Sequence, residues 1–374
     1  MTAAVSRRTL FGIGGGATLA LASAPARALA PPPPPPADPF APPEGVAFLA
    51  RNENPYGPSP RAKQAVADLC GSGCYYASGG EDRLAAMIAE ANGLTPDHVL
   101  IGAGSSEVLN CATMGLTGGG HILSADLTFD PPVRYAEAKG VAVKRVPLAP
   151  DMQVDLAAMQ AAVGPDTRLV HICNPNNPTG LLLPNAALRS FAAAVSPKAI
   201  LLVDEAYNEL TADPAGESLV DRVRAGDNLI VARTFSKIYG LAGMRVGYAL
   251  ARPDIIARMR PWSMSVGGNT GGLAAAIATY PDAAFLGYSK GRILEAREMI
   301  EAAAKSAGLP TLKSATNFVY VKVPDAAAVQ KRLEAKGILI RGPYGKWTQW
   351  SRVSCGKIED VARYAAALPE AARA

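Results

Sequence analysis

One lysine of this sequence stands where a lysine can hold an aldehyde. Lys237 lies in a loop rich in hydroxyl residues and glycine, after an apolar run that ends near Ala232 and is typical of a buried strand. A lysine there can attack an aldehyde and form a Schiff base, provided that its surroundings lower its pKa. Thr234, Ser236 and Arg245 add two hydroxyl groups and one cation, which suit a phosphate dianion. Taken singly, Lys237 would be an ordinary surface lysine, so its neighbours carry the hypothesis.

An aspartate follows a second apolar run. Asp204 comes directly after residues 199–203, at the carboxyl end of an expected strand, where open α/β sheets bind ligands. A carboxylate there can pair with a protonated pyridine nitrogen and keep the ring an electron sink. The alternative interpretation is a helix cap, because aspartate commonly begins helices.

Two further loops also follow expected strands. Residues 174–180 read Asn-Pro-Asn-Asn-Pro-Thr-Gly. The amide of Asn177 can donate a hydrogen bond to a phenolic oxygen, but the alternative is an ordinary turn, because these residue types dominate turns. Residues 102–107 read Gly-Ala-Gly-Ser-Ser-Glu and join a strand to a helix, so main-chain N–H groups and the helix dipole can meet a phosphate. Neither loop is specific by itself.

These loops need a scaffold, and from about Glu44 onward short apolar runs alternate with helical patterns. Such alternation predicts an α/β fold in which helices cover a largely parallel sheet. The residues expected to form strands are 98–102, 121–125, 141–146, 168–173, 199–203, 228–232 and 246–250.

The pattern changes after Pro261, and the change predicts a second, smaller α+β domain. A long helical stretch is expected from about residue 272 to residue 307, then a strand at 317–323, a helix through Lys336, and strand-like residues 338–341 and 352–355. The expected division is 1–43 for an export signal and proline-rich linker, 44–75 for the N-terminal part of the small domain, 76–261 for a large cofactor-binding domain and 262–374 for the C-terminal small domain.

In order and spacing, these loops together resemble the fold type I aminotransferases of class I and II, most closely the histidinol-phosphate aminotransferase-like branch. The resemblance extends from about Arg51 to Lys357, and residues 51–58, Arg-Asn-Glu-Asn-Pro-Tyr-Gly-Pro, look like the N-terminal signature of that branch. It implies the fold type I architecture, pyridoxal 5'-phosphate as cofactor, small-molecule amino acid and 2-oxo acid substrates, and a homodimer.

The resemblance also implies roles for individual residues. Lys237 would be the Schiff-base lysine and proton shuttle, Asp204 the partner of the pyridine nitrogen, and Tyr207 and Asn177 the donors to the ring oxygen. Arg352 would grip the substrate carboxylate, because its planar guanidinium suits bidentate binding. The other residues are assigned to the cofactor phosphate (Ser105, Ser106, Thr234, Ser236, Arg245), to stacking on the ring (Phe129), to the neighbouring subunit's phosphate (Tyr76) and to the substrate (Tyr56, Arg341).

The chain departs from the family pattern at two places. The branch usually has a tyrosine followed by proline and an acidic residue, whereas residues 75–80 read Tyr-Tyr-Ala-Ser-Gly-Gly. Tyr76 is the better match to that tyrosine, and Tyr75 is the alternative. Residues 343–350, before Arg352, are unusually aromatic and lie where the family recognises substrate side chains, so the identity of the substrate is left open.

The implied reaction is a transamination in two halves, in which Lys237 moves a proton between the substrate and the cofactor. Sequence does not reveal which bond of the substrate α-carbon lies perpendicular to the ring, so a lyase, decarboxylase or cyclase on the same scaffold is an alternative. A non-catalytic periplasmic binder is an alternative of another class. The presence of Lys237, Asp204 and Arg245 argues against a binder, which has no need of a Schiff-base lysine.

The N-terminus predicts export. Arg7 and Arg8 precede an apolar, glycine-rich run to about Ala22 and then small residues with A-x-A spacing, a pattern typical of a twin-arginine-type signal. An ordinary secretion signal or a lipid-interacting N-terminus is the alternative, and the cleavage site is open. Residues 31–36 are all proline and predict an extended spacer. We therefore expect a periplasmic or exported enzyme that uses the twin-arginine machinery and is membrane-tethered if uncleaved.

Composition argues against two other classes of protein. The net charge of +5 is small for 374 residues and the basic residues are scattered, so no nucleic-acid partner is expected. The five cysteines show no CxxC pair and no histidine cluster, so no metal site and no disulfide framework are indicated. We expect the cysteines to be buried apolar side chains, with a Cys70–Cys74 disulfide in an oxidising compartment as the alternative.

Overall fold

The computed structural model describes residues 40–373. Residues Glu44–Ala374 form one compact unit. The predicted export signal and the proline run lie outside the described residues. Among the residues that are described, no helix combines the length and the apolar character needed to cross a membrane.

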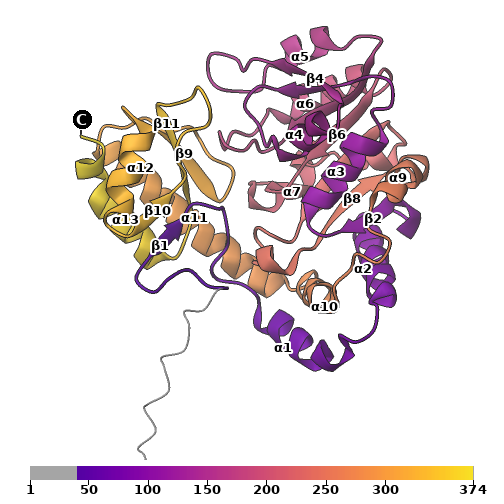
Figure 1. The fold of residues 1–374 in the computed structure, drawn as a ribbon, viewed down its shortest axis with the longest axis horizontal. Helices are drawn as coiled ribbons and strands as arrows, with labels where there is room; N and C mark the ends of the chain where they lie inside the picture. Colours follow the sequence, from indigo (N-terminus) through magenta and orange to yellow (C-terminus); the bar gives the residue numbers. More distant parts are fainter. Residues whose placement is uncertain (1–39, 374) are drawn as a thin grey trace, which may run out of the picture. The chain divides into compact units, whose positions relative to one another are not determined.

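A seven-stranded sheet forms the centre of the first part of this unit, and its strand order is β2-β8-β7-β6-β5-β3-β4 (Figure 1). Neighbouring strands are parallel except for β8, which runs antiparallel to both β2 and β7. The predicted α/β fold with a mostly parallel sheet is confirmed. The strands are β2 (Val99–Gly102), β3 (His121–Ala125), β4 (Ala142–Val146), β5 (Thr167–Cys173), β6 (Ile200–Asp204), β7 (Leu229–Thr234) and β8 (Gly247–Ala251).

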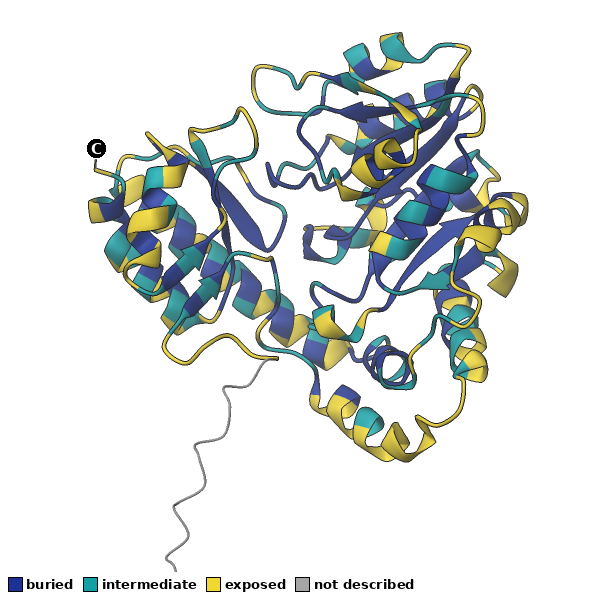
Figure 2. Ribbon diagram, in the orientation of Figure 1, coloured by how far each residue is buried: buried dark blue, intermediate teal, exposed yellow. Residues whose placement is uncertain are grey.

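Helices cover both faces of this sheet, which is why its central strands are mostly apolar on both faces. In β6, Leu201 and Val203 pack on one face, and Ile200 and Leu202 pack on the other, because side chains alternate along a strand. Figure 2 shows the strands buried and the outer faces of the helices exposed. One face is covered by α3 (Ser105–Gly115), α4 (Pro131–Ala138) and α9 (Pro253–Met259), and the other by α2 (Ser78–Ala91), α5 (Leu156–Ala162), α6 (Asn185–Val195) and α8 (Val220–Arg224).

The C-terminal part contains two small sheets. Strand β9 (Phe318–Lys322) pairs antiparallel with β11 (Trp350–Ser354), and β1 (Ala47–Leu49) pairs parallel with β10 (Ile338–Ile340). Three helices pack around them, as Figure 1 shows in orange and yellow. They are α11 (Ala283–Ser306), α12 (Ala326–Glu334) and α13 (Ile358–Ala371).

The expected helical stretch over residues 272–307 is confirmed, and it consists of two helices. Helix α10 (Thr270–Thr279) ends before Pro281, and α11 begins at Ala283. Proline has no N–H to donate and its ring clashes with the preceding turn, so a helix stops there. Asp282 then caps α11 by accepting a hydrogen bond from the N–H of Phe285 at 3.1 Å.

The chain joins its N-terminal segment to the C-terminal part at β1 and then turns back towards the large sheet. Helix α1 (Pro60–Leu69) follows and packs on α10. Between β1 and α1, the segment Ala50–Ser59 passes the carboxyl ends of the large sheet. The predicted division into large and small domains stays a prediction.

Candidate active site

A cavity of about 1000 Å³ lies where the segment after β1, the C-terminal part and the carboxyl edge of the large sheet meet. Sheet topology explains the convergence, because β2, β3, β5, β6 and β7 all end at this edge and β8 begins there. Most of the residues that sequence analysis assigned to the site line the cavity. These are Ser105, Ser106, Phe129, Asn177, Asp204, Tyr207, Thr234, Ser236, Lys237, Arg245, Arg341 and Arg352.

Lys237 follows β7 and extends its amine into the cavity. The Nζ atom donates a hydrogen bond to the main-chain carbonyl of Asn52 at 3.3 Å and lies 5.8 Å from the centre of the Tyr207 ring. Burial, and after it the positive charge of Arg352, lowers the pKa of Lys237 to about 8. A substantial fraction of the amine is therefore neutral near physiological pH, as a nucleophile requires.

Asp204 is the last residue of β6 and is almost completely buried. Its Oδ1 accepts a hydrogen bond from the N–H of Ala206 at 3.1 Å, and the thiol of Cys173 lies 4.0 Å from Oδ2. Burial raises the pKa of Asp204 to about 7. The carboxylate thus lacks a cationic hydrogen-bond partner among the described residues and is poised to accept one from a ligand. The helix-cap interpretation is wrong, because the next helical turn begins only at Asn208.

The Tyr207 hydroxyl lies between two amides. Asn177 Nδ2 is 3.3 Å from it and Asn52 Nδ2 is 3.2 Å from it, and both amides donate to the phenolic oxygen. With its acceptor sites filled by N–H groups, the hydroxyl keeps its own proton available for a ligand oxygen. Burial raises the pKa of Tyr207 well above the usual tyrosine range, so this proton is held at neutral pH.

A polar cradle forms between β2, β7 and β8. Thr234 Oγ1 donates to Ser236 Oγ at 2.9 Å, and Arg245 Nη1 donates to the same Ser236 oxygen at 3.4 Å. Gly104 precedes α3 with a φ of 78°, and no side chain caps the first turn of this helix. A Cβ on Gly104 would collide with the Arg245 guanidinium. Hydroxyl groups, a guanidinium and a helix N-terminus therefore lie together, and the glycine at position 104 lets the Arg245 guanidinium approach the main chain before α3.

Two arginines face the cavity from the C-terminal part. Arg352, in β11, donates Nη1 to Asn177 Oδ1 and Nη2 to the carbonyl of Ala50, both at 2.8 Å. Its buried Nε has no hydrogen-bond partner. Arg341 lies opposite Arg352 in an isolated antiparallel bridge, so both side chains project on the same side. Two cations held on one side of a bridge repel each other, which favours an anionic ligand between them.

Tyr56 and Tyr76 lie elsewhere in this single chain. The Tyr56 hydroxyl accepts a hydrogen bond from the N–H of Ile358 at 3.0 Å, and its ring packs edge-on against Tyr288. Tyr76 is 82% exposed, and the neighbouring Tyr75 is 76% exposed. Their roles in binding substrate and a neighbouring subunit's phosphate stay predictions.

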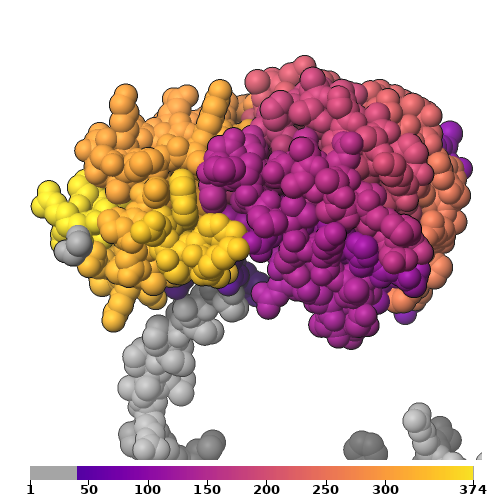
Figure 3. Space-filling model, turned by 90° about the horizontal axis from the view of Figure 1, so that it is seen from above, coloured from indigo at the N-terminus to yellow at the C-terminus, as the bar shows by residue number. Residues whose placement is uncertain are grey.

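An ion pair beside the cavity, which we call the clasp, was not predicted from the sequence; it joins Lys346 to Asp126. Residues 344–347 form a tight turn in which the N–H of Trp347 bonds the carbonyl of Tyr344 at 3.0 Å. At its tip, Lys346 Nζ lies 2.6 Å from Asp126 Oδ2, and Asp126 directly follows β3. In Figure 3, the yellow surface of the C-terminal segment adjoins the magenta surface of the segment around β3 and β4. The aromatic run was visible in the sequence, but nothing marked Asp126 as its partner.

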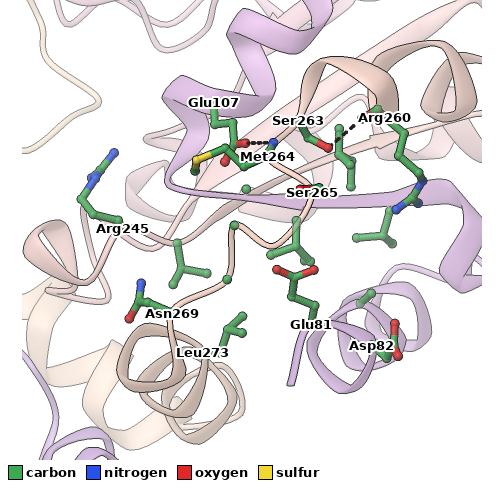
Figure 4. A pocket seen from close by; sticks show the side chains of 18 of the residues that line it. Glu81, Asp82, Glu107, Arg245, Arg260, Ser263, Met264, Ser265, Asn269 and Leu273 are labelled. Atoms are coloured by element: carbon green, nitrogen blue, oxygen red, sulfur yellow. Dashed lines mark hydrogen bonds between the residues drawn. The ribbon is translucent and has the colours of Figure 1, made fainter. Parts of the chain in front are cut away.

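A second hollow, of about 650 Å³, adjoins the other side of Arg245. Figure 4 shows Glu81 and Glu107 in it, and Glu107 accepts a hydrogen bond from the N–H of Met264 at 2.8 Å. Burial raises the pKa of Glu81. This hollow contains carboxylates but neither a lysine amine nor a buried cation, so the chemistry belongs to the larger cavity.

The cysteines only partly match the expectation that they are buried. Cys111, Cys173 and Cys355 are buried, whereas Cys70 and Cys74 are exposed, and all five thiols are free. Cys70 opens a short helical turn at the end of α1, where no core covers it. Among residues 40–373, no group of three or more histidine, cysteine, aspartate or glutamate side chains is placed to hold a metal ion.

The chain is similar in sequence and in fold to known proteins. The family described as aminotransferase class I and II matches residues 45–368. Histidinol-phosphate aminotransferase 1 of Cupriavidus pinatubonensis is 38% identical over 341 residues, covering 87% of this chain and 88% of that protein. The enzyme named histidinol-phosphate aminotransferase of Moorella thermoacetica is 37% identical over 330 residues, with 87% and 85% covered. The crystal structure of histidinol-phosphate aminotransferase from Sinorhizobium meliloti in complex with pyridoxal-5'-phosphate has a TM-score of 0.80 at 31% identity, covering 88% of this chain and 91% of that chain.

Proposed function

The chain belongs to the class I and II aminotransferase family, and we propose from this premise that it moves an amino group between an amino acid, or an amine resembling histidinol phosphate, and a 2-oxo acid. It is a pyridoxal-phosphate-dependent aminotransferase, and the substrate pair is the proposed part. The observation that carries the proposal is the convergence of Lys237, Asp204 and Arg352 on one cavity. The similarity to histidinol-phosphate aminotransferases supports the amine, and Arg341 and Arg352, which form no ion pair in the described part of the chain, support acidic substrates.

Pyridoxal phosphate fits the residues present. Its phosphate suits the cradle of Ser236, Arg245 and the N-terminus of α3, where Gly104 lets the Arg245 guanidinium lie beside the first turn of the helix. Asp204 offers a buried carboxylate that has no cationic hydrogen-bond partner within residues 40–373, which matches a protonated pyridine nitrogen. When bound, the cofactor supplies an electron sink for the carbanion that forms at the substrate α-carbon.

The side chains around it perform distinct tasks. The Lys237 amine would hold the cofactor covalently and, as a free amine, would move a proton at the substrate α-carbon. Asp204 would pair with the ring nitrogen, and the Tyr207 hydroxyl would donate a hydrogen bond to the ring oxygen. Arg352 orients the substrate by its carboxylate, and its contact with Asn177 fixes that orientation relative to the ring.

Two further proposals concern partners and location. The chain acts as a homodimer, as is typical of the family, and the exposed rings of Tyr75, Tyr76 and Trp262 support a second copy as the partner. The chain is exported through the twin-arginine machinery, and the basis for this is the sequence around Arg7 and Arg8. Export of a folded, cofactor-loaded enzyme fits a phosphorylated cofactor that is acquired in the cytoplasm.

A panel of amino donors and 2-oxo acids tests the proposed reaction, provided that both products are followed. Transamination yields a new amino acid and a new oxo acid in equal amounts. Release of ammonia or carbon dioxide instead would indicate a lyase or a decarboxylase. A protein that binds the cofactor but converts no pair would contradict an aminotransferase. Histidinol phosphate belongs in the panel beside acidic and aromatic amino acids, because residues 343–350 leave the side chain open.

A further inference from the structure

Asn52 lies in the segment that follows β1, and none of the roles assigned above includes it. It is only 2% exposed. Its φ of 56° is left-handed, a conformation that asparagine adopts more readily than other residues with a side chain. A buried polar residue with this backbone is costly unless its contacts offset the cost, so the contacts indicate what the residue does.

Asn52 contacts two groups that the proposed function uses directly. Its main-chain carbonyl accepts the hydrogen bond from Lys237 Nζ at 3.3 Å. Its side-chain Nδ2 donates to the Tyr207 hydroxyl at 3.2 Å. One residue therefore holds the amine that moves the proton and the phenol that faces the ring oxygen.

The C-terminal part holds Asn52 in turn. Ser354 Oγ accepts from the Asn52 N–H at 2.8 Å and donates to Asn52 Oδ1 at 2.7 Å. Asn317 Nδ2 donates to the same Asn52 carbonyl that Lys237 uses, at 2.8 Å. Every polar group of Asn52 thus has a protein partner, so the residue suits positioning better than direct ligand binding.

The same segment also holds the substrate-facing arginine. Ala50, two residues before Asn52, accepts a hydrogen bond from Arg352 Nη2 at 2.8 Å. Arg352 and Ser354 both belong to β11, and their side chains bond Ala50 and Asn52 respectively. Two carbonyls of one short segment therefore set where the carboxylate-binding guanidinium and the lysine amine lie relative to each other.

We propose that Asn52 is a positioning residue that ties the Lys237 amine and the Tyr207 hydroxyl to β11, and so to Arg352. The inference rests on the proposed function and specifies how this chain sets its catalytic geometry. Proton transfer requires the amine near the α-carbon while the guanidinium holds the carboxylate of the same substrate. A shift of the segment would misplace both groups without removing either.

The chemistry of asparagine explains the residue type. Glycine would keep the left-handed backbone, the carbonyl and the main-chain N–H bond to Ser354, but would lose the side-chain bonds to Tyr207 and Ser354. Aspartate would keep the shape and the acceptor but lose the donor to Tyr207 and add a negative charge near Lys237. Alanine would strain the backbone that presents the carbonyl.

The test compares Asn52→Gly and Asn52→Asp with the wild type, with Asn54→Ala as the matched control. Asn54 is a buried residue of the same segment, but its amide bonds the Ile238 carbonyl at 2.8 Å and lies outside the cavity. Three quantities are measured: the far-ultraviolet circular dichroism of the cofactor-free protein, the rate at which it captures added pyridoxal phosphate as a function of pH, and kcat and KM in the transamination assay.

Asn52→Gly should fold and capture the cofactor with an unchanged pH midpoint, and kcat should fall about tenfold or more while KM changes much less. Asn52→Asp should move the pH midpoint of capture upward, because a nearby negative charge favours the protonated amine. Asn54→Ala should leave kcat within about twofold of the wild-type value and the pH midpoint of capture within about 0.2 pH units. Its amide bonds the Ile238 carbonyl and contacts neither the Lys237 amine nor the Tyr207 hydroxyl. If the Asn52→Gly variant does not fold, Ser354→Ala takes its place in the test. We expect the same fall in kcat for it, because Ser354 Oγ bonds both the N–H and the Oδ1 of Asn52.

Wild-type kcat and pH profile in a folded Asn52→Gly variant, or an Asn54→Ala variant that loses as much kcat, would overturn the positioning role. Failure of the proposed function looks different. In that case the wild type itself captures no pyridoxal phosphate, or captures it equally well after Lys237→Ala.

Discussion

Arg352 Nη1 donates to Asn177 Oδ1 over 2.8 Å, and Asn177 Nδ2 donates to the Tyr207 hydroxyl at 3.3 Å. The arginine that we propose to bind the substrate carboxylate is therefore hydrogen-bonded, through one amide, to the phenol that we propose to bind the cofactor ring. Because both bonds use the same planar side chain, the position of the guanidinium and that of the phenol depend on each other. Changes to Arg352 should consequently affect more than substrate affinity.

Arg352→Lys should raise KM and lower kcat for every carboxylate substrate. An ammonium cannot bond Asn177, the Ala50 carbonyl and both oxygens of a carboxylate together, as the guanidinium fork can. We expect kcat/KM to fall about a hundredfold, or about 2.7 kcal/mol of transition-state stabilisation. Steady-state kinetics with several amino acids measures it, and an amine without a carboxylate should lose mainly its reaction with the oxo-acid partner. Loss confined to one amino acid would mean that Arg352 recognises a side chain instead.

Asp204 should make the cofactor-free protein less stable as the pH rises. Burial raises its pKa from 3.8 to about 7, so between these values the folded state binds a proton that the unfolded state does not. The free energy of unfolding that this group contributes is therefore present at pH 4 and is lost by about pH 7. It falls by up to about 1.4 kcal/mol for each pH unit in between. Asn is neutral throughout, so Asp204→Asn should gain stability relative to the wild type across this window.

Urea unfolding of the two cofactor-free proteins at several pH values measures this difference. The comparison should reverse once pyridoxal phosphate is bound, because the carboxylate then pairs with the ring nitrogen and Asn cannot. A difference between the two proteins that is constant from pH 4 to pH 7 would refute a raised pKa at Asp204.

Lys346→Ala should raise KM two- to threefold or so and leave kcat nearly unchanged, because the ion pair with Asp126 holds the turn over the cavity mouth without touching the reacting atoms. The effect should shrink as salt is added, since Lys346 is exposed. Lys336→Ala is the matched control, because Lys336 pairs with Glu370 on the surface at 2.9 Å. Equal changes in KM for the two variants would show that the clasp has no role in substrate binding.

Sequence reasoning predicted the α/β fold well, because strands buried on both faces are continuously apolar and their ends carry turn residues. Several strand ends were misplaced by one or two residues. Strand β6 includes Asp204 and β7 includes Thr234, since polar residues at strand ends still pair in the ladder. The break at Pro281 was overlooked because the apolar helical pattern continues on both sides of it.

The site was predictable where a residue follows a strand at the carboxyl edge of the sheet, as Lys237, Asp204 and Asn177 do. Contacts between segments far apart in sequence were not predictable. Asn52 meets Lys237 across 185 residues, and Asp126 meets Lys346 across 220 residues. Such pairs depend on how the C-terminal part packs on the large sheet, and a local pattern does not encode this packing.

Changing both Arg7 and Arg8 to lysine should trap active, cofactor-loaded enzyme in the cytoplasm, because the paired arginines are the proposed recognition element for export. Cell fractionation with activity measurements in each compartment tests this, and N-terminal sequencing of the exported protein locates the cleavage site. Continued export of the double variant would favour the general secretion route. Uncleaved wild-type protein at the membrane would favour an N-terminal anchor.

The central claim is that Lys237 holds the cofactor covalently, and borohydride reduction followed by peptide mass spectrometry tests it most directly. Reduction of the cofactor-loaded protein makes the carbon–nitrogen bond permanent, so the modified lysine can be identified in a digest. The account predicts a pyridoxyl group on the peptide that contains Lys237, and its absence after Lys237→Ala. A pyridoxyl group on another lysine of the wild type, or none on any lysine of a protein that holds the cofactor, would contradict the account.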